Sequence, residues 1–170
     1  MRRQVSRLLP IVVALAALAG QPAHAGTATG SFSVSATVIS ACTVSGSALS
    51  FGTTVNPLST AVPLYAQSQL SVQCTNTTPY AVALNAGTNA GGASNFSARA
   101  MKNGSNSIGY QLYSDTGHST VWGDGTNSSS TVSGTGSGST QTLNIYGSVP
   151  SLAGAVPGSY TDTVTVTVSY

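Results

Sequence analysis

Residues 160–170 alternate strictly between two kinds of side chain. One set is apolar apart from a single aspartate and comprises Tyr160, Asp162, Val164, Val166, Val168 and Tyr170. The residues between them are threonines and one serine. Because successive side chains of a strand point to opposite faces, this period of two predicts a strand with one buried side and one solvent-facing side.

Shorter runs of the same kind recur along the chain. They predict strands over 70–74, 80–84, 108–113 and 142–149, and a short strand over 49–51. Residues 85–95 and 123–139 are rich in Gly, Ser, Thr and Asn and are predicted to be loops. No useful helical period appears, and abundant Gly, Ser and Thr disfavours helices. Short strands separated by turn residues predict an all-β protein, an antiparallel β-sandwich.

A further alternating segment covers residues 31–39. Its apolar positions are Phe32, Val34, Ala36 and Val38, and serine or threonine stands between them. The pattern alone leaves two interpretations open. The segment is either the first strand of the protein's own sandwich or a strand given to a neighbouring molecule.

The first 25 residues have the pattern of a secretory signal peptide. Arg2, Arg3 and Arg7 precede an apolar run over 8–19, and small residues stand at Ala23 and Ala25. The run is shorter than the roughly 20 apolar residues that cross a bilayer. No second apolar run follows, so we expect an exported protein that is soluble or assembled on a surface.

The few charged residues argue against nucleic-acid binding. The 170 residues include five Lys and Arg and three Asp and Glu, with a pI near 8.7. Three of the bases lie in the leader, and the rest of the chain has a net charge of −1. The two remaining basic residues, Arg99 and Lys102, are too few to contact the several phosphates of a bound nucleic acid. We expect them in a solvated turn or paired with an aspartate.

Two cysteines, Cys42 and Cys74, follow the leader. An even count in an exported chain favours a disulfide between them, and closing this loop stabilises by about 3–4 kcal/mol in the chain-entropy model. The alternatives are buried free thiols or a metal site. A CxxC spacing is absent and His118 is the one histidine after the leader, so we expect no metal.

Candidate catalytic motifs are weak, and we expect neither an enzyme nor a bound cofactor. Asp115 and His118 fall in one polar turn without the nucleophile and orienting group of a triad. Residues 134–139 resemble a phosphate loop only in glycine content. Trp122 and the tyrosines could form a sugar-stacking surface, but Tyr110, Tyr113 and Tyr146 lie in predicted strands, so we expect them to pack in the core or the groove. Asp162 interrupts an apolar face, and we expect it at the strand's solvated end.

Several short sequence motifs, taken in order, resemble those of a known protein family. They are Ala41–Val44, Leu49–Gly52, Val72–Cys74, Pro79–Tyr80, Arg99–Gly104, Ile108–Tyr113, Trp122–Gly123, Tyr146–Gly147 and Gly158–Val164. Their order and spacing over residues 30–170 resemble the spore coat protein U domain family, which includes subunits of archaic chaperone–usher pili.

The resemblance implies an incomplete immunoglobulin-like antiparallel β-sandwich that is completed by a donated strand. Residues 1–25 would be the signal peptide, 26–39 the donor segment and 40–170 the pilin domain. Phe32, Val34, Ala36 and Val38 would enter the groove of the next subunit. The residues expected to line that groove are Tyr160, Val164, Val166, Val168 and Tyr170.

The implied function is a structural pilin of a surface fibre that supports adhesion and biofilm formation. Its partners would be other pilin subunits, a periplasmic chaperone and an outer-membrane usher, and its route would lead through the periplasm to the cell surface. The alternatives are a self-complemented secreted coat protein and a minor or tip adhesin that binds a surface ligand.

Overall fold

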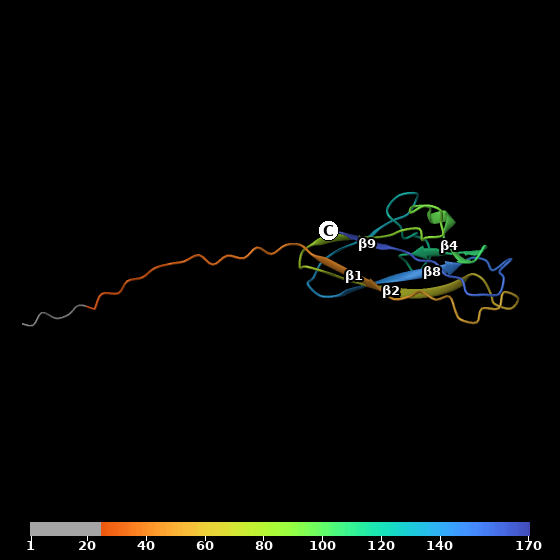
Figure 1. The fold of residues 1–170 in the computed structure, drawn as a ribbon, viewed down its shortest axis with the longest axis horizontal. Coiled ribbons are helices and arrows are strands. Elements are labelled where there is room, and N and C mark those ends of the chain that lie inside the picture. The colour runs from red at the N-terminus through yellow and green to blue at the C-terminus, as the bar shows by residue number, and fades with distance from the viewer. Residues whose placement is uncertain (1–24) are drawn as a thin grey trace, which may run out of the picture. The chain divides into compact units, whose positions relative to one another are not determined.

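The computed structural model describes residues 25–170, so the predicted signal peptide lies almost wholly outside the described residues. Within that range the chain forms nine strands and one short 3₁₀ turn (Figure 1). The strands are β1 Cys42–Gly46, β2 Leu64–Cys74, β3 Pro79–Leu84, β4 Ala100–Asn103, β5 Asn106–Gly109, β6 Gln111–Tyr113, β7 Val132–Thr135, β8 Gln141–Val149 and β9 Val166–Ser169, and the turn is η1 Phe96–Ala98. The all-β prediction is confirmed.

The strands form two main sheets and a separate hairpin, and every pairing is antiparallel. One sheet has the order β1-β2-β8-β6 and the other the order β7-β3-β9, while β4 pairs with β5. The inward faces of both sheets contribute to one hydrophobic core, to which β2 supplies Leu70 and Val72 and β3 supplies Val82 and Leu84. The result is a two-layer sandwich.

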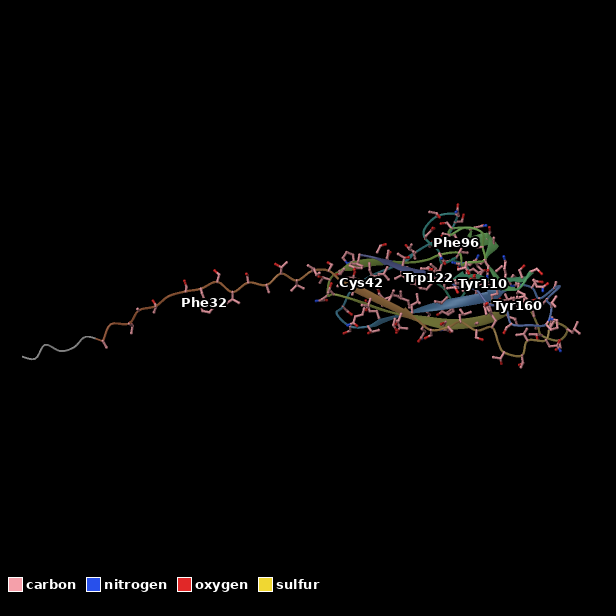
Figure 2. The ribbon with its side chains drawn as sticks, in the orientation of Figure 1. Phe32, Cys42, Phe96, Tyr110, Trp122 and Tyr160 are labelled. Carbon is pink, nitrogen blue, oxygen red and sulfur yellow. A yellow bond between two sulfur atoms is a disulfide. The ribbon has the colours of Figure 1, made fainter. Side chains whose placement is uncertain are left out.

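Trp122 lies at the centre of this core. Its side chain is fully buried, and its indole Nε1 donates a hydrogen bond to the carbonyl oxygen of Val82 at 2.9 Å (Figure 2). Tyr110 is also buried. These two aromatic residues are therefore core residues and not a sugar-stacking surface. The expectation of core or groove packing was wrong for Tyr113 and Tyr146, which are half-buried on the outward face of their sheet.

Several sequence predictions about strands were wrong. Of the strand predicted over 160–170, only Val166–Ser169 form one, β9. Residues 49–51 are not a strand, the predicted loop over 123–139 contains β7, and the predicted strand over 108–113 is broken at Tyr110 into β5 and β6. Residues 31–39 also form no strand. A β-strand requires hydrogen bonds to a neighbouring strand, and within residues 25–170 no strand pairs with this segment. The strand β1 was not predicted, since its side chains are mostly exposed and show no alternation.

Arg99 is buried, and the prediction of a solvated turn was wrong for it. Only 2% of the residue is exposed, and its guanidinium donates to the carbonyl oxygens of Asn85 (2.8 Å) and Trp122 (2.9 Å) and to Oε1 of Gln111 (2.8 Å). The guanidinium also lies over the ring of Phe96, 5.1 Å from its centroid. Burial lowers the pKa of Arg99 to about 10, which leaves the side chain charged at neutral pH.

The predicted disulfide between Cys42 and Cys74 is present. The two cysteines are directly opposite each other in the β1–β2 ladder, so the bond ties the first strand of the sandwich to the second. Within residues 25–170 β1 pairs with β2 alone, so this bond reinforces the one ladder that β1 forms there.

Candidate functional site: an open groove between two sheet edges

Two edge strands, β1 and β9, approach each other without pairing, and the sandwich is open beside them, between residues 46–51 and residues 160–166. β1 pairs with β2 on one side, and β9 pairs with β3 on one side. Across residues 25–170 no ladder joins β1 to β9. Each strand therefore has one side on which backbone N–H and C=O groups lack a neighbouring strand, which is the arrangement that accepts an added strand.

The direction of these backbone groups follows from the bonds that the extended segment leading into β9 makes on its other side. The backbone groups of Thr161, Thr163 and Thr165 bond toward β4 and the loop after β3. Because consecutive residues of a strand direct their backbone groups to opposite edges, those of Val164 and Val166 point to the open side. The open edge thus offers regularly spaced donors and acceptors.

The inward side of β1 is only partly covered. Val44 is opposite Val72 in the ladder, and directly opposed residues share a face of the sheet. Val72 is fully buried, yet Val44 is 37% exposed. The interior of the sandwich is therefore open to solvent along β1.

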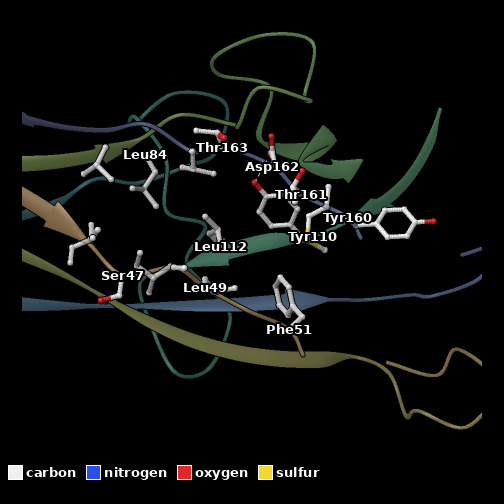
Figure 3. A pocket seen from close by; sticks show the side chains of 17 residues that line it. Ser47, Leu49, Phe51, Leu84, Tyr110, Leu112, Tyr160, Thr161, Asp162 and Thr163 are labelled. Atoms are coloured by element: carbon white, nitrogen blue, oxygen red, sulfur yellow. Dashed lines mark hydrogen bonds between the residues drawn. The ribbon is translucent and has the colours of Figure 1, made fainter. Parts of the chain in front are cut away.

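Two cavities of about 510 Å³ and 620 Å³ lie along this opening. They share four lining residues, Leu49, Phe51, Met101 and Tyr160, so they follow one another along one groove. In Figure 3 Leu49 and Phe51 stand on one side of the first cavity, across from Tyr110 and Asp162. Core residues form its floor, namely Leu70, Leu84, Tyr110, Leu112 and Ile145.

The residues expected to line the groove are only partly found there. Tyr160, Val164 and Val166 line it. Val168 is half-buried and packs against the core without lining either cavity, and Tyr170 is 61% exposed and lies outside both. Over residues 160–169 every even-numbered residue is half-buried and every odd-numbered residue is exposed, so the predicted alternation is correct.

The residues of the wall opposite Tyr160, Val164 and Val166 were not predicted to line a groove. Leu49 and Phe51 were expected in a short strand of the sandwich, but they belong to an irregular segment that follows β1 and lines both cavities. The spacing of the two apolar residues around Ser50 is the signal that predicts a shared direction for their side chains. Met101, from β4, closes the groove between the walls.

A polar contact joins the floor of the groove to its wall. Oδ2 of Asp162 accepts a hydrogen bond from the hydroxyl of Tyr110 at 2.7 Å, and Oδ1 accepts from the hydroxyl of Thr88 and the backbone N–H of Asn89. The expectation of a solvated strand end was therefore wrong for Asp162. Burial, together with the bond to this carboxylate, raises the pKa of Tyr110 well above its usual range.

The predicted donor residues are exposed. Phe32 and Val34 are 88% and 85% exposed, and Val38 is 88% exposed. Large apolar side chains are rarely left in water in a regular series. Ala36, which is also exposed, completes the alternating set.

The remaining candidate chemistry is structural. The carboxylate of Asp115 accepts bonds from the backbone N–H groups of Ser119 and Thr120, and these bonds lower its pKa. No cluster of three or more potential metal ligands occurs among residues 25–170. Over the same residues, no helix has the length and apolar character needed to traverse a membrane.

The fold and the groove together define an all-β, antiparallel, immunoglobulin-like sandwich that is not closed. The Spore Coat Protein U domain model matches residues 28–167, and the chain belongs to this family. It is 31% identical to "Protein U" of Myxococcus xanthus, over 94% of both proteins.

A solved structure has the same fold. It is the pre-assembly complex of chaperone CsuC with the tip adhesion subunit CsuE, from the archaic chaperone–usher Csu pili of Acinetobacter baumannii. The match has a TM-score of 0.56 and 27% identity, and it covers 79% of this chain. This chain spans only 40% of the matched chain.

Proposed function

We propose that the chain is a structural subunit of a chaperone–usher surface fibre that polymerises by donor-strand exchange. Residues 26–39 of one copy would fill the groove of the next copy. The observation that carries this proposal is the uncovered groove between residues 46–51 and the 160–166 segment, along which no strand of residues 25–170 pairs with the backbone. An added strand satisfies the backbone and fills the cavities in one step.

The lengths of the segment and the groove agree. Phe32 and Val38 are six residues apart, which is about 20 Å in a strand. Tyr160 and Val166, the outermost lining residues of the 160–166 segment, are also six residues apart. Four alternating anchors would contribute about 1–3 kcal/mol each when buried, with Ala36 at or below the lower limit.

The chemistry of the connecting residues disfavours insertion of the segment into its own groove beside β1. Ile39, Ser40 and Ala41 connect the segment to β1, and a return beside that strand needs a tight hairpin. Such turns require positive φ angles and are built with Gly, Asn or Asp. Residues 31–45 contain none of these three types. Donation to a second copy avoids the turn and, because it is head-to-tail, extends a filament.

The partners follow from the same groove. A sandwich with an open edge aggregates unless the edge is covered, so a periplasmic chaperone would protect it during export and an outer-membrane usher would direct the exchange. The chaperone-bound state of the matched Csu subunit supports this assignment. The fibre would act at the cell surface in adhesion and biofilm formation, without catalysis or a cofactor.

A second candidate function is a secreted coat protein that is stable without a partner. The family match favours it, because the model is described as a Spore Coat Protein U domain and covers residues 28–167. On this alternative the groove of each molecule is closed within that molecule. The two candidates differ in whether the folded protein requires a second copy.

The decisive experiment compares the full chain with a variant that lacks residues 26–39. We expect the full chain to give a ladder of oligomers on an unboiled denaturing gel, because release of a buried strand requires extensive unfolding. The deletion variant should give no ladder but should bind a synthetic peptide of residues 28–40. A ladder that persists in the deletion variant would refute the proposal. A stable full-length monomer that does not bind the peptide would support the coat protein.

A further inference from the structure

A second feature lies on the outward face of the four-stranded sheet, away from the groove. Tyr65 of β2, Tyr113 of β6 and Tyr146 of β8 occupy outward positions of three adjacent strands. In the ladders Tyr113 is opposite Tyr146, and Tyr65 is opposite Ser148, two residues further along β8. The three rings are therefore brought together by strand register.

His118 joins the three tyrosines into one cluster. Its ring centroid lies 4.4 Å from that of Tyr65, 5.3 Å from that of Tyr113 and 6.2 Å from that of Tyr146. The last two contacts are edge-to-face, and the contact with Tyr65 is tilted by 40°. We call these four residues the aromatic platform.

The loop that carries His118 is held in a fixed and unusual conformation. His118 has a φ of +54°, in the left-handed region that side chains other than glycine rarely adopt. The carboxylate of Asp115 accepts the backbone N–H groups of Ser119 and Thr120, and Ser114 donates to the carbonyl of Thr120. The loop therefore presents the imidazole ring on the sheet from a backbone conformation that its own hydrogen bonds hold.

The platform is exposed at Tyr65 and half-buried at Tyr113, His118 and Tyr146, and it has unused hydrogen-bonding groups. Tyr65 is 60% exposed. Among the hydrogen bonds of residues 25–170, none involves the hydroxyls of Tyr65, Tyr113 and Tyr146 or the ring nitrogens of His118. Amide side chains of the same face continue from it: Gln67, Gln69 and Asn144, of which the last two are hydrogen-bonded at 3.2 Å.

The residue types on the outward face of this sheet indicate which class of ligand it can bind. Strands β2, β6 and β8 carry no charged residue, which excludes a polyanion such as nucleic acid. The imidazole ring fills the space between the tyrosines, so a quaternary ammonium group has no cage to enter. Flat aromatic rings beside uncharged amides and hydroxyls suit a ligand with one apolar face and many hydroxyl groups.

We propose that the Tyr65–Tyr113–His118–Tyr146 platform binds a neutral oligosaccharide, with a pyranose ring stacked on Tyr65 and its hydroxyls bonded to the adjacent amides. The proposal goes beyond polymerisation and does not depend on it, because the platform faces outward from the sheet and the groove is inside the sandwich. A fibre would present one platform for each copy, which raises avidity for a surface polysaccharide.

The test titrates the full chain with cellohexaose, maltohexaose and chitohexaose, and follows amide chemical shifts. We expect saturable binding of at least one probe below about 10 mM, with shifts centred on β2 and residues 114–120. Y65A and H118G should weaken that binding by about tenfold or more, and Y65F by less than about threefold because stacking remains. H118G keeps a residue that tolerates the positive φ, so loss of binding there reports loss of the ring.

L58A is the matched control, because Leu58 is an exposed apolar residue outside the platform and should leave binding unchanged. Absence of saturable binding for all three probes would overturn the proposal. Unchanged affinity in the Y65A/H118G double variant would overturn it as well, as would a loss of oligomers instead of sugar binding in Y65A. The unboiled gel, run in parallel, reports separately whether polymerisation has failed.

Discussion

Tyr110 donates its hydroxyl hydrogen to Oδ2 of Asp162 at 2.7 Å. The first residue is a buried part of the groove floor, between β5 and β6, and the second belongs to the wall that precedes β9. Asp162 also holds the loop after β3 through Thr88 and Asn89. The contact therefore fixes the wall against which a donated strand would pair.

The Y110F variant should lower the free energy of unfolding by about 1–2 kcal/mol, because it removes a hydrogen bond to a charged group and leaves Asp162 with its other donors. Urea denaturation measures the change. The Y160F control removes a hydroxyl that bonds only to the exposed backbone of Val156, and it should change stability by less than about 0.5 kcal/mol.

The same variant should alter stability at alkaline pH. The folded-state pKa of Tyr110 is raised above the ordinary value near 10, so its contribution is complete below about pH 10 and is lost as the pH rises further. The lowered pKa of Arg99 acts with the opposite sign in this range, so the informative quantity is the difference between variants. Wild type should lose stability more steeply than Y110F above about pH 10. Parallel pH profiles would contradict this.

Arg99 and Lys102 should respond very differently to the same substitution. R99M leaves the carbonyl oxygens of Asn85 and Trp122 without their donor in the interior, and should destabilise the fold by about 2–5 kcal/mol. K102M changes an exposed side chain and should have an effect below about 0.5 kcal/mol. Thermal or urea unfolding of both variants is the measurement. Similar losses would show that charge, and not the buried hydrogen bonds, is what matters.

Loss of the disulfide should weaken the first strand of the sandwich. The C42S/C74S variant opens a loop with a sequence separation of 32 and should lose about 3–4 kcal/mol in the chain-entropy model. Reduction of the wild-type protein should produce the same shift in the urea midpoint, whereas the double variant should be insensitive to reductant. A reductant effect on the double variant would point to another cause.

Gly147 lies beneath the groove wall, and its replacement should disturb donor binding. A Cβ at this position would lie 2.9 Å from Cζ of Phe51 and about 3.0 Å from Cδ2 of Leu49. G147A should displace these two side chains toward the groove and weaken binding of the 28–40 peptide by about tenfold, equivalent to 1.4 kcal/mol. G109A is the control, because its Cβ meets only the carbonyl of Arg99 at 3.8 Å. Equal affinities in fluorescence titration would contradict the prediction.

Burial was predicted best from the sequence where it depends on local backbone geometry alone. The alternation over 160–170 depends only on strand geometry, and the burial pattern follows it up to residue 169. Leu49 and Phe51 were assigned to a strand because the same rule cannot tell a strand from an irregular segment whose alternate side chains face a groove. Their role depends on β4 and on the 160–166 segment, which are distant in sequence.

Long-range contacts explain the other errors. Arg99 was placed in solvent because charged residues are mostly exposed, but its partners Asn85, Gln111 and Trp122 lie 12 to 23 residues away and offer oxygen acceptors. Asp162 was placed at a solvated end for the same reason. Its partner Tyr110 is separated by 52 residues. Neither set of partners has a local sequence signal.

The alternation in the donor segment provides the sharpest comparison between neighbouring residues. V34D places a charge at a position that enters the groove on the donor-strand proposal, whereas S35D places the same charge on the opposite face. A buried, unpaired carboxylate is strongly unfavourable, so V34D should abolish the oligomer ladder. S35D should retain the ladder, because its carboxylate would stay in water. Equal ladders for both variants would mean that the segment does not enter a groove as an alternating strand, and loss of both would point to a general intolerance of charge in residues 26–39.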